Sequence, residues 1–302
     1  MSLSNKGGAH LVIGLATVFL LGVSTGCGSL TCGGDLSIHE ASKKGCCKTV
    51  EKLLGKDPSL VKARHQKMGE LPLHFAGSAK VAGILIKNGA DVNARDNIGD
   101  TPLHDAANAK VAELLIRSGA NVNTFNEVSE TPLHRAKNAG VAKMLIKHGA
   151  NVNGVPGQRV SPLHAAVQLS RADVIKVLIK EGANVNQTLD QGWTLLHAAA
   201  VAKSPDVIQV LHKNGLDVNR RDSYGATPLH VAALNDHVDG AITLLKLGAD
   251  VDATLNDGIV EYQKNILSQK ETPVRDVSGK TPLGIARSMK MKRVLKEHGA
   301  AK

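Results

Sequence analysis

Histidine is the residue type with the clearest chemical potential in this sequence of 302 residues. Seven histidines recur in one sequence context, at His39, His74, His104, His134, His164, His197 and His230. An imidazole near neutral pH can act as a general base or as a metal ligand, so the pattern raises the question of catalysis. A catalytic histidine is needed once, however, and is not copied into every unit of a repeat. The regular recurrence therefore indicates a structural role.

The other groups that could support chemistry lack the spacing that a reaction needs. The one G-x-S-x-G spacing, Gly22-Val23-Ser24-Thr25-Gly26, ends the apolar N-terminal run, so it is not the strand-to-helix elbow that presents a nucleophile. Gly279-Lys280-Thr281 matches only the end of a phosphate-binding loop, because Val274 stands where that motif requires glycine. Carboxylates such as Asp96 fall in polar turns, and Cys46 and Cys47 have no metal-ligand spacing. The sequence thus predicts no catalytic residue, no metal site and no cofactor, and hence a protein that is not an enzyme.

The histidines recur within a four-residue motif, called the frame here, that is clearest at Thr101-Pro102-Leu103-His104. Threonine is a good helix cap, and proline fits the first position of a helix because its missing N–H costs nothing there. Residues 103–107 predict a short first helix, and the apolar spacing over 111–115 predicts a second, amphipathic helix. Gly119 is placed to end that second helix.

Neither predicted helix can bury its apolar stripe alone, so the units must gain stability by stacking on one another. The recurring Thr-Pro-Leu-His, with Gly-Ala-Asn-Val-Asn at 119–123, 149–153 and 182–186 and Gly-Ala-Asp-Val-Asn at 89–93, resembles ankyrin repeats. The resemblance covers residues 36–302. It implies a mainly α solenoid of stacked helix-turn-helix units with β-hairpin finger loops and a concave face that binds proteins.

The repeat frame divides this ankyrin-like domain into units of unequal length. Units are expected to start near residues 36, 71, 101, 131, 161, 194, 227 and 281, with a cap at each end. The units at 71, 101 and 131 have 30 residues where later ones have 33, which predicts a shortened first helix or turn. The unit at 227 carries an insertion over 254–275. Insertions in repeat arrays often map to the binding face, and a tolerated surface loop is the alternative.

The first 34 residues do not fit the array, and residues 1–26 are expected to form an export signal. Lys6 precedes an apolar run of 13 residues, Leu11 to Val23, which suits an export signal better than a membrane span of about 20 residues. Ser24-Thr25-Gly26-Cys27 resembles the lipobox of bacterial lipoproteins, although Ser24 stands where leucine or valine is usual. The resemblance implies lipidation of Cys27, a flexible tether over 27–35 and a membrane-anchored protein of the cell envelope. A secreted or singly anchored protein and a cytoplasmic protein are the alternatives.

The cysteine count bears on the redox state. Cys27, Cys32, Cys46 and Cys47 are the four cysteines, and lipidation of Cys27 would leave three. An odd count argues against a disulfide framework. We therefore expect Cys46 and Cys47 to be buried as small apolar residues where the second helix of the first unit begins. A bridge through Cys32, or one to another molecule, is the alternative.

Finger loops are the candidate sites of partner contact. The second residue after the asparagine of each Val-Asn is Arg95, Phe125, Val155, Thr188 or Arg221. Aromatic residues make up only 2% of the chain, and those beyond the first units fall in finger loops. Because arginine and aromatic side chains are the usual anchors of interfaces, the predicted contact residues are Arg95, Phe125, Trp193, Arg221, Tyr224 and Tyr262. Coverage of the finger backbone is the alternative for Phe125 and Trp193.

The net charge of +10 is compatible with an acidic protein surface, an anionic membrane or a nucleic acid. Lysine and arginine are spread over many repeats and are not gathered with stacking aromatics, which argues against nucleic-acid binding. Lys43, Lys44, Lys48 and Lys52 are expected to mark the solvated face of the first cap. The sequence therefore predicts a non-catalytic scaffold with a protein partner and a membrane tether, with no small-molecule substrate. A secreted effector that acts on host proteins is the alternative.

Overall fold

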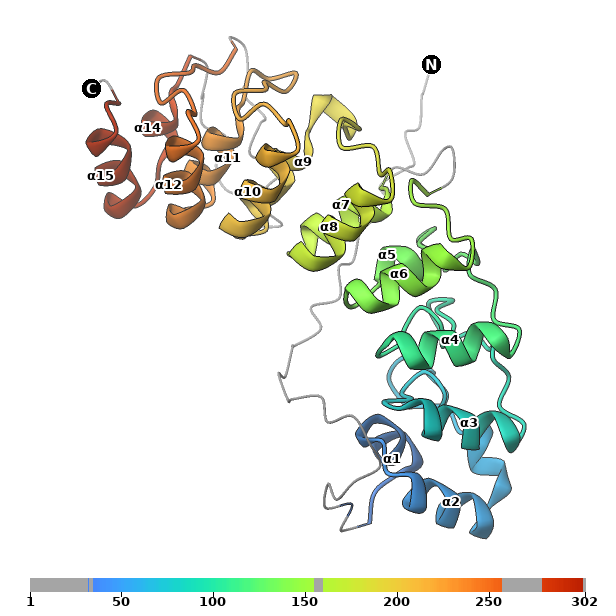
Figure 1. Ribbon diagram of the computed structural model, residues 1–302. Helices are drawn as coiled ribbons and strands as arrows, with labels where there is room; N and C mark the ends of the chain where they lie inside the picture. Colours follow the sequence, from blue (N-terminus) through green and yellow to red (C-terminus); the bar gives the residue numbers. More distant parts are fainter. Residues whose placement is uncertain (1–31, 33–34, 155–159, 257–278, 301–302) are drawn as a thin grey trace, which may run out of the picture.

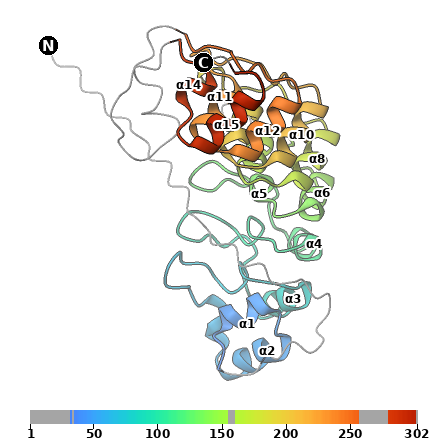
Figure 2. The same ribbon diagram turned by 90° about the vertical axis from the view of Figure 1, so that its left-hand side faces the viewer.

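A computed structural model describes residue 32 and residues 35–154, 160–256 and 279–300. Helix pairs stack side by side in one curved row, from α1 at one end to α15 at the other (Figure 1). From the side, the second helices of the units that start at 71, 101, 131 and 161 lie along one edge and the loops of these units along the other (Figure 2). The mainly α solenoid is confirmed. The leader, Cys27, Val155, Tyr262 and most of the 254–275 insertion lie outside the described residues.

The first unit is built from three helical segments. They are α1 (Ile38–Lys44), α2 (Cys47–Lys56) and the 3-10 helix η1 (Pro58–Lys62). Ser37 and Glu40 form a capping box at the start of α1, and Gly45 ends it at φ +74°, where glycine is favoured. The four lysines expected on the solvated face of the first cap, Lys43, Lys44, Lys48 and Lys52, are all exposed.

Each later unit contributes a second helix of nine residues. These are α3 (Ala79–Lys87), α4 (Ala109–Arg117), α6 (Ala139–Lys147), α8 (Ala172–Lys180), α10 (Pro205–Lys213), α12 (Val238–Lys246) and α15 (Met289–Glu297). The full-length first helices are α7 (Pro162–Gln168), α9 (Leu195–Val201) and α11 (Pro228–Leu234).

The shortened first helix of the 30-residue units is confirmed. α5 (Pro132–Arg135) and α14 (Pro282–Ile285) have four residues each, and residues 72–75 and 102–105 form only turns. The helix expected over 103–107 is therefore absent. The chain turns at once into the next helix, where the Asn108 side chain caps α4 and its Nδ2 reaches back to the Gly77 carbonyl oxygen at 3.1 Å. Side-chain capping thus replaces the missing turn of helix.

One apolar core runs the length of the stack. The leucine of each Thr-Pro-Leu-His frame is buried, as is a leucine of each facing second helix, such as Leu103 and Leu115. Each second helix contacts the next, from α3 to α15. Each unit therefore gains its core from its neighbours, as expected for a linear array.

The fingers contain no β-strand in the described residues, which corrects the expected β-hairpins. A finger closes with short-range main-chain hydrogen bonds, such as Asp96 N–H to the Asp100 carbonyl at 3.0 Å and Gly99 N–H to the Asp96 carbonyl at 3.2 Å. In three fingers Asp96, Asn126 or Asp222 also accepts two backbone N–H groups through its side-chain oxygen. These local bonds compete with a strand ladder and fix a tight turn instead. No helix in the described part of the chain is both long and apolar enough to cross a membrane.

Candidate functional site

The recurring histidines connect each unit to the next finger. In five units a backbone N–H at the frame's first residue donates to the histidine Nδ1 over 3.0–3.2 Å. Nδ1 is therefore the unprotonated nitrogen, and the Nε2–H donates to a backbone carbonyl of the following finger. Six such contacts measure 2.9–3.2 Å, as from His134 to the Val160 oxygen. The histidines hold the fingers in place.

Burial favours the neutral form of five of these histidines. Desolvation lowers the pKa of His134, His164, His197 and His230 to about 4, and it also lowers that of His104. Both nitrogens of most of the rings are already hydrogen-bonded within the fold, so they offer no free group to a substrate. Among the described residues no three His, Cys, Asp or Glu side chains gather as a metal site would require. The recurring histidines therefore have a structural role.

Trp193 is a correction to the predicted contact residues. It is 7% exposed, so it is not the exposed anchor that we expected. Its ring packs on His197, with centroids 5.1 Å apart, and belongs to the apolar core. Leu189 stands where other fingers have Asp or Asn, so this finger lacks the polar cap and gains an apolar cover instead. The neighbouring His164 Nε2 is buried and has no hydrogen-bond partner among the described residues, which makes this boundary the exception in the histidine series.

Three apolar side chains lie in register on the tips of adjacent fingers. Met68, Ile98 and Val128 are 30 residues apart, and we call them the tip stripe. Their fingers are joined by backbone hydrogen bonds, from Asn97 N–H to the Met68 oxygen at 2.9 Å and from Glu127 N–H to the Ile98 oxygen at 3.0 Å. Met68 is 40% exposed and Val128 59%, while Ile98 is partly exposed. The tip stripe is therefore an ordered apolar surface and not three scattered side chains.

The other predicted contact residues are exposed, and one of them also bonds to the next finger. Phe125, 38% exposed, lies on the same finger as Val128. Arg95 is exposed and lies across Gly99, where a Cβ atom would come within 2.5 Å of its guanidinium. Arg221 is exposed but donates to the Thr254 carbonyl oxygen of the next finger, so part of its role is to join fingers.

Tyr224 is half-buried, and its carbonyl oxygen accepts from Asn256 N–H at 2.9 Å. It occupies the tip position of its finger, in the same register as Ile98 and Val128. The sequence-based choice of contact residues missed the tip stripe. It took the second residue after each Val-Asn, which precedes the residue at the tip of the finger. Counting steps of 30 residues back from Val128 to Ile98 and Met68 would have found it.

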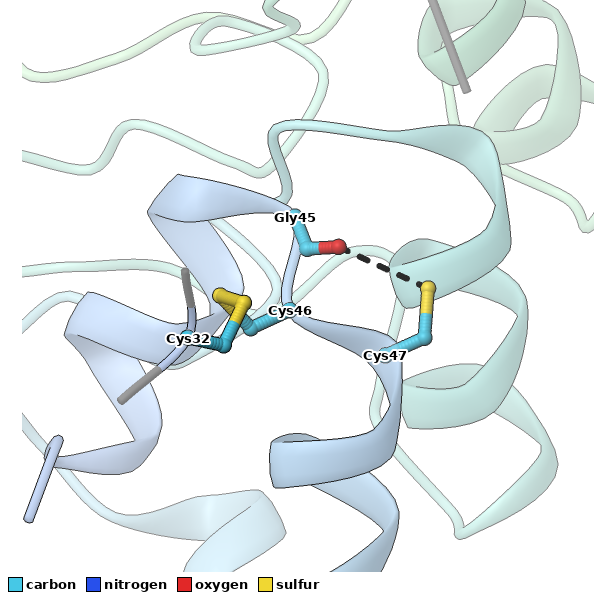
Figure 3. Close-up of a disulfide and its surroundings, with 4 residues drawn as sticks. All are labelled: Cys32, Gly45, Cys46 and Cys47. Carbon is cyan, nitrogen blue, oxygen red and sulfur yellow. Dashed lines mark hydrogen bonds between the residues drawn. A yellow bond between two sulfur atoms is a disulfide. The ribbon is translucent and has the colours of Figure 1, made fainter. Parts of the chain in front are cut away.

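The first cap contains a disulfide that corrects the cysteine prediction. Cys32 and Cys46 are bonded, with their Cα atoms 6.0 Å apart (Figure 3). Cys46 is buried as expected, but it is oxidised, and Cys47 is a buried thiol outside this disulfide. The Cys47 Sγ donates to the Gly45 carbonyl oxygen at 3.5 Å. The bridge that uses Cys32 was the alternative at the sequence level.

The sequence matches the family described as ankyrin repeats (3 copies) over residues 38–126, 108–189 and 181–255. The chain belongs to the ankyrin repeat family. Its members are generally non-catalytic modules of protein–protein interaction.

Two solved ankyrin repeat domains share the fold. The human ASB11 ankyrin repeat domain has 24% identity and a TM-score of 0.60, over 77% of this chain and all of that chain (100%). The ankyrin repeat domain of Bcl-3, described as a unique member of the IkappaB protein family, has 20% identity and a TM-score of 0.50, over 87% of this chain and 99% of that one. No curated protein sequence matches the chain significantly.

Proposed function

We propose that this ankyrin protein is a non-catalytic scaffold, exported and held at a membrane by its N-terminus, that binds a protein partner through its finger loops and concave face. The tip stripe carries the proposal. Single exposed apolar residues are common on protein surfaces, whereas an ordered apolar group is typical of an interaction site. Backbone hydrogen bonds between the fingers and the histidine contacts fix the stripe before any partner arrives, which lowers the entropy cost of binding.

The Cys32–Cys46 disulfide supports the exported location. Disulfides persist in secreted and envelope proteins and are rare in the reducing cytosol. Lipidation of Cys27 would leave three cysteines, of which two form this bond and Cys47 is buried. The odd count is therefore compatible with an oxidising compartment. Labelling of the chain with a fatty-acid analogue, and its loss in Cys27→Ser, tests the anchor.

The binding surface is tested by affinity capture with charge substitutions on and off the stripe. Val128→Lys places a charge at the centre of a desolvated contact, so we expect partner affinity to fall at least about tenfold. Leu169→Lys is the matched control, because Leu169 is 47% exposed at the end of α7 and lies outside the fingers. Equal capture by both variants would argue against the stripe as the binding surface.

The insertion needs a separate variant. Removal of residues 257–275 keeps Thr254 and Asn256, whose backbone groups contact Arg221 and Tyr224 of the preceding finger. We expect weaker capture if the insertion contributes to the interface. Unchanged capture by the shortened chain would assign binding to the fingers alone.

A further inference from the structure

The first cap presents an unpaired row of lysines. Lys48, Lys52 and Lys56 are exposed at four-residue steps along α2, on the side opposite the buried Cys47, Val50 and Leu54. Exposed Lys43 and Lys44 end α1. We call these five residues the cap lysines. None of them forms an ion pair with a carboxylate in the described part of the chain. Helices α1 and α2 contain two glutamates against these five lysines, a net charge of +3.

The disulfide fixes the N-terminal segment in the middle of these charges. Cys46 lies between α1 and α2, within three residues of Lys43, Lys44 and Lys48 along the chain. Cys32 is bonded to it there (Figure 3). The N-terminal segment is therefore attached to the fold at the turn between the two basic helices, and not at the start of α1.

The attachment point limits how far the cap can be from an N-terminal anchor. Cys27 precedes Cys32 by five residues, and a fully extended chain of that length spans at most about 18 Å. Without the disulfide the free segment would run from Cys27 to Ser37, twice that length. A lipid on Cys27 thus holds Cys32, and with it the turn between α1 and α2, within about two Debye lengths of the bilayer surface.

We propose that the cap lysines bind the anionic headgroups of the bilayer that holds the N-terminus. The inference rests on the proposed membrane tether and adds a second, electrostatic contact beside it. Each lysine near an anionic surface strengthens binding about fivefold, so the cap lysines together form a substantial contact. Because α1 and α2 form one end of the row (Figure 1), this contact leaves the later units to extend from the membrane.

The other end of the array provides an internal control. On α15, Lys292 and Lys296 lie beside Arg293 in a basic row, at the end of the chain farthest from the cap (Figure 1). A surface of similar charge without a tether should bind anionic lipid far less. Tether-directed binding and general adsorption of a basic protein therefore predict different labelling of α15.

The test measures lysine acetylation by mass spectrometry on the full chain reconstituted through its N-terminus into vesicles. One vesicle contains phosphatidylcholine alone, and the other contains phosphatidylglycerol as well. We expect the cap lysines to react about fivefold more slowly on the anionic vesicle, with Lys292 and Lys296 unchanged. This protection should disappear at about 1 M salt, where the Debye length is about 3 Å.

Two triple variants that each remove three positive charges make the test more specific. In Lys48→Gln/Lys52→Gln/Lys56→Gln the remaining Lys43 and Lys44 should lose their protection. In Lys110→Gln/Lys143→Gln/Lys176→Gln, which removes three exposed lysines from the middle of the array, the cap lysines should stay protected.

Four results would overturn the inference. If the chain stays on both vesicles and the cap lysines are labelled equally on them, the headgroup contact is wrong and the tether stands. Equal protection of the α15 lysines would show general adsorption of a basic protein. Stronger protection of the cap by duplex DNA than by anionic lipid would assign the surface to nucleic acid. A chain that neither vesicle retains would remove the tether and this contact together.

Discussion

Trp193 shows how one side chain can change its role with its finger. At the corresponding position other fingers have Asp100, Glu130, Val160 or Ala226, and the Asp100 carboxylate accepts from the Asn126 amide at 2.8 Å. Trp193 instead lies over His197, with its ring buried. The residue therefore contributes apolar burial to the array and little surface to a partner.

We expect Trp193→Ala to lower the free energy of unfolding by about 3 to 5 kcal/mol, the usual cost of removing a buried aromatic ring. Urea unfolding followed by circular dichroism measures this loss. Phe125→Ala is the control, because its exposed ring should change stability by less than about 1 kcal/mol while weakening partner capture. A Trp193 variant of normal stability and reduced capture would return Trp193 to the interface.

The first helix pair depends on a covalent link as well as on packing. The Cys32–Cys46 bond closes a loop across 14 residues that contains α1. A terminal unit of a linear array has a neighbour on one side only, so it opens before the interior units do. The disulfide restricts the unfolded chain where the array needs stabilisation most.

Cys32→Ser should therefore reduce the stability of the first unit by about 2 to 3 kcal/mol, the value expected for a loop of this length. Hydrogen exchange should become faster in α1 and α2 and stay unchanged in α10 and α12. Cys47→Ala is the matched control, since it removes a buried thiol of the same unit without breaking the bond. If exchange in α1 and α2 is no faster in Cys32→Ser than in the unchanged protein, packing alone holds the cap.

The stacking of the units could be predicted from the repeated frame, whereas the conformation of the fingers and the features that occur once could not. Thr101-Pro102-Leu103-His104 encodes capping, helix start and core contact in four adjacent residues, so its recurrence determines the stack. The missing three residues of the short units likewise gave the short α5. The Cys32–Cys46 bond joins the repeats to a segment outside them, and the burial of Trp193 follows from the loss of a polar cap at Leu189. Both depend on tertiary proximity, which a repeat frame does not contain.

The whole array should respond to acid because the same ionisable group recurs in it. Protonation of a histidine at Nδ1 would place a proton against the backbone N–H that now donates to this nitrogen, as at His134. Burial lowers the folded-state pKa of His134, His164, His197 and His230 to about 4, against about 6.5 in the unfolded chain. The neutral rings therefore contribute stability that is fully present above about pH 6.5 and is lost as the pH falls toward about 4.

The slope of this effect follows from the number of protons taken up on unfolding. Each such histidine contributes at most about 1.4 kcal/mol per pH unit, and the four together at most about 5. We expect the urea midpoint to decrease steeply between about pH 6.5 and about pH 5, with little change between about pH 7 and about pH 8. His148→Gln should leave the slope unchanged, because His148 is exposed at the end of α6. A midpoint that is constant down to about pH 5 would show that the histidine contacts tolerate protonation, since the unfolded chain would then take up no extra protons in that range.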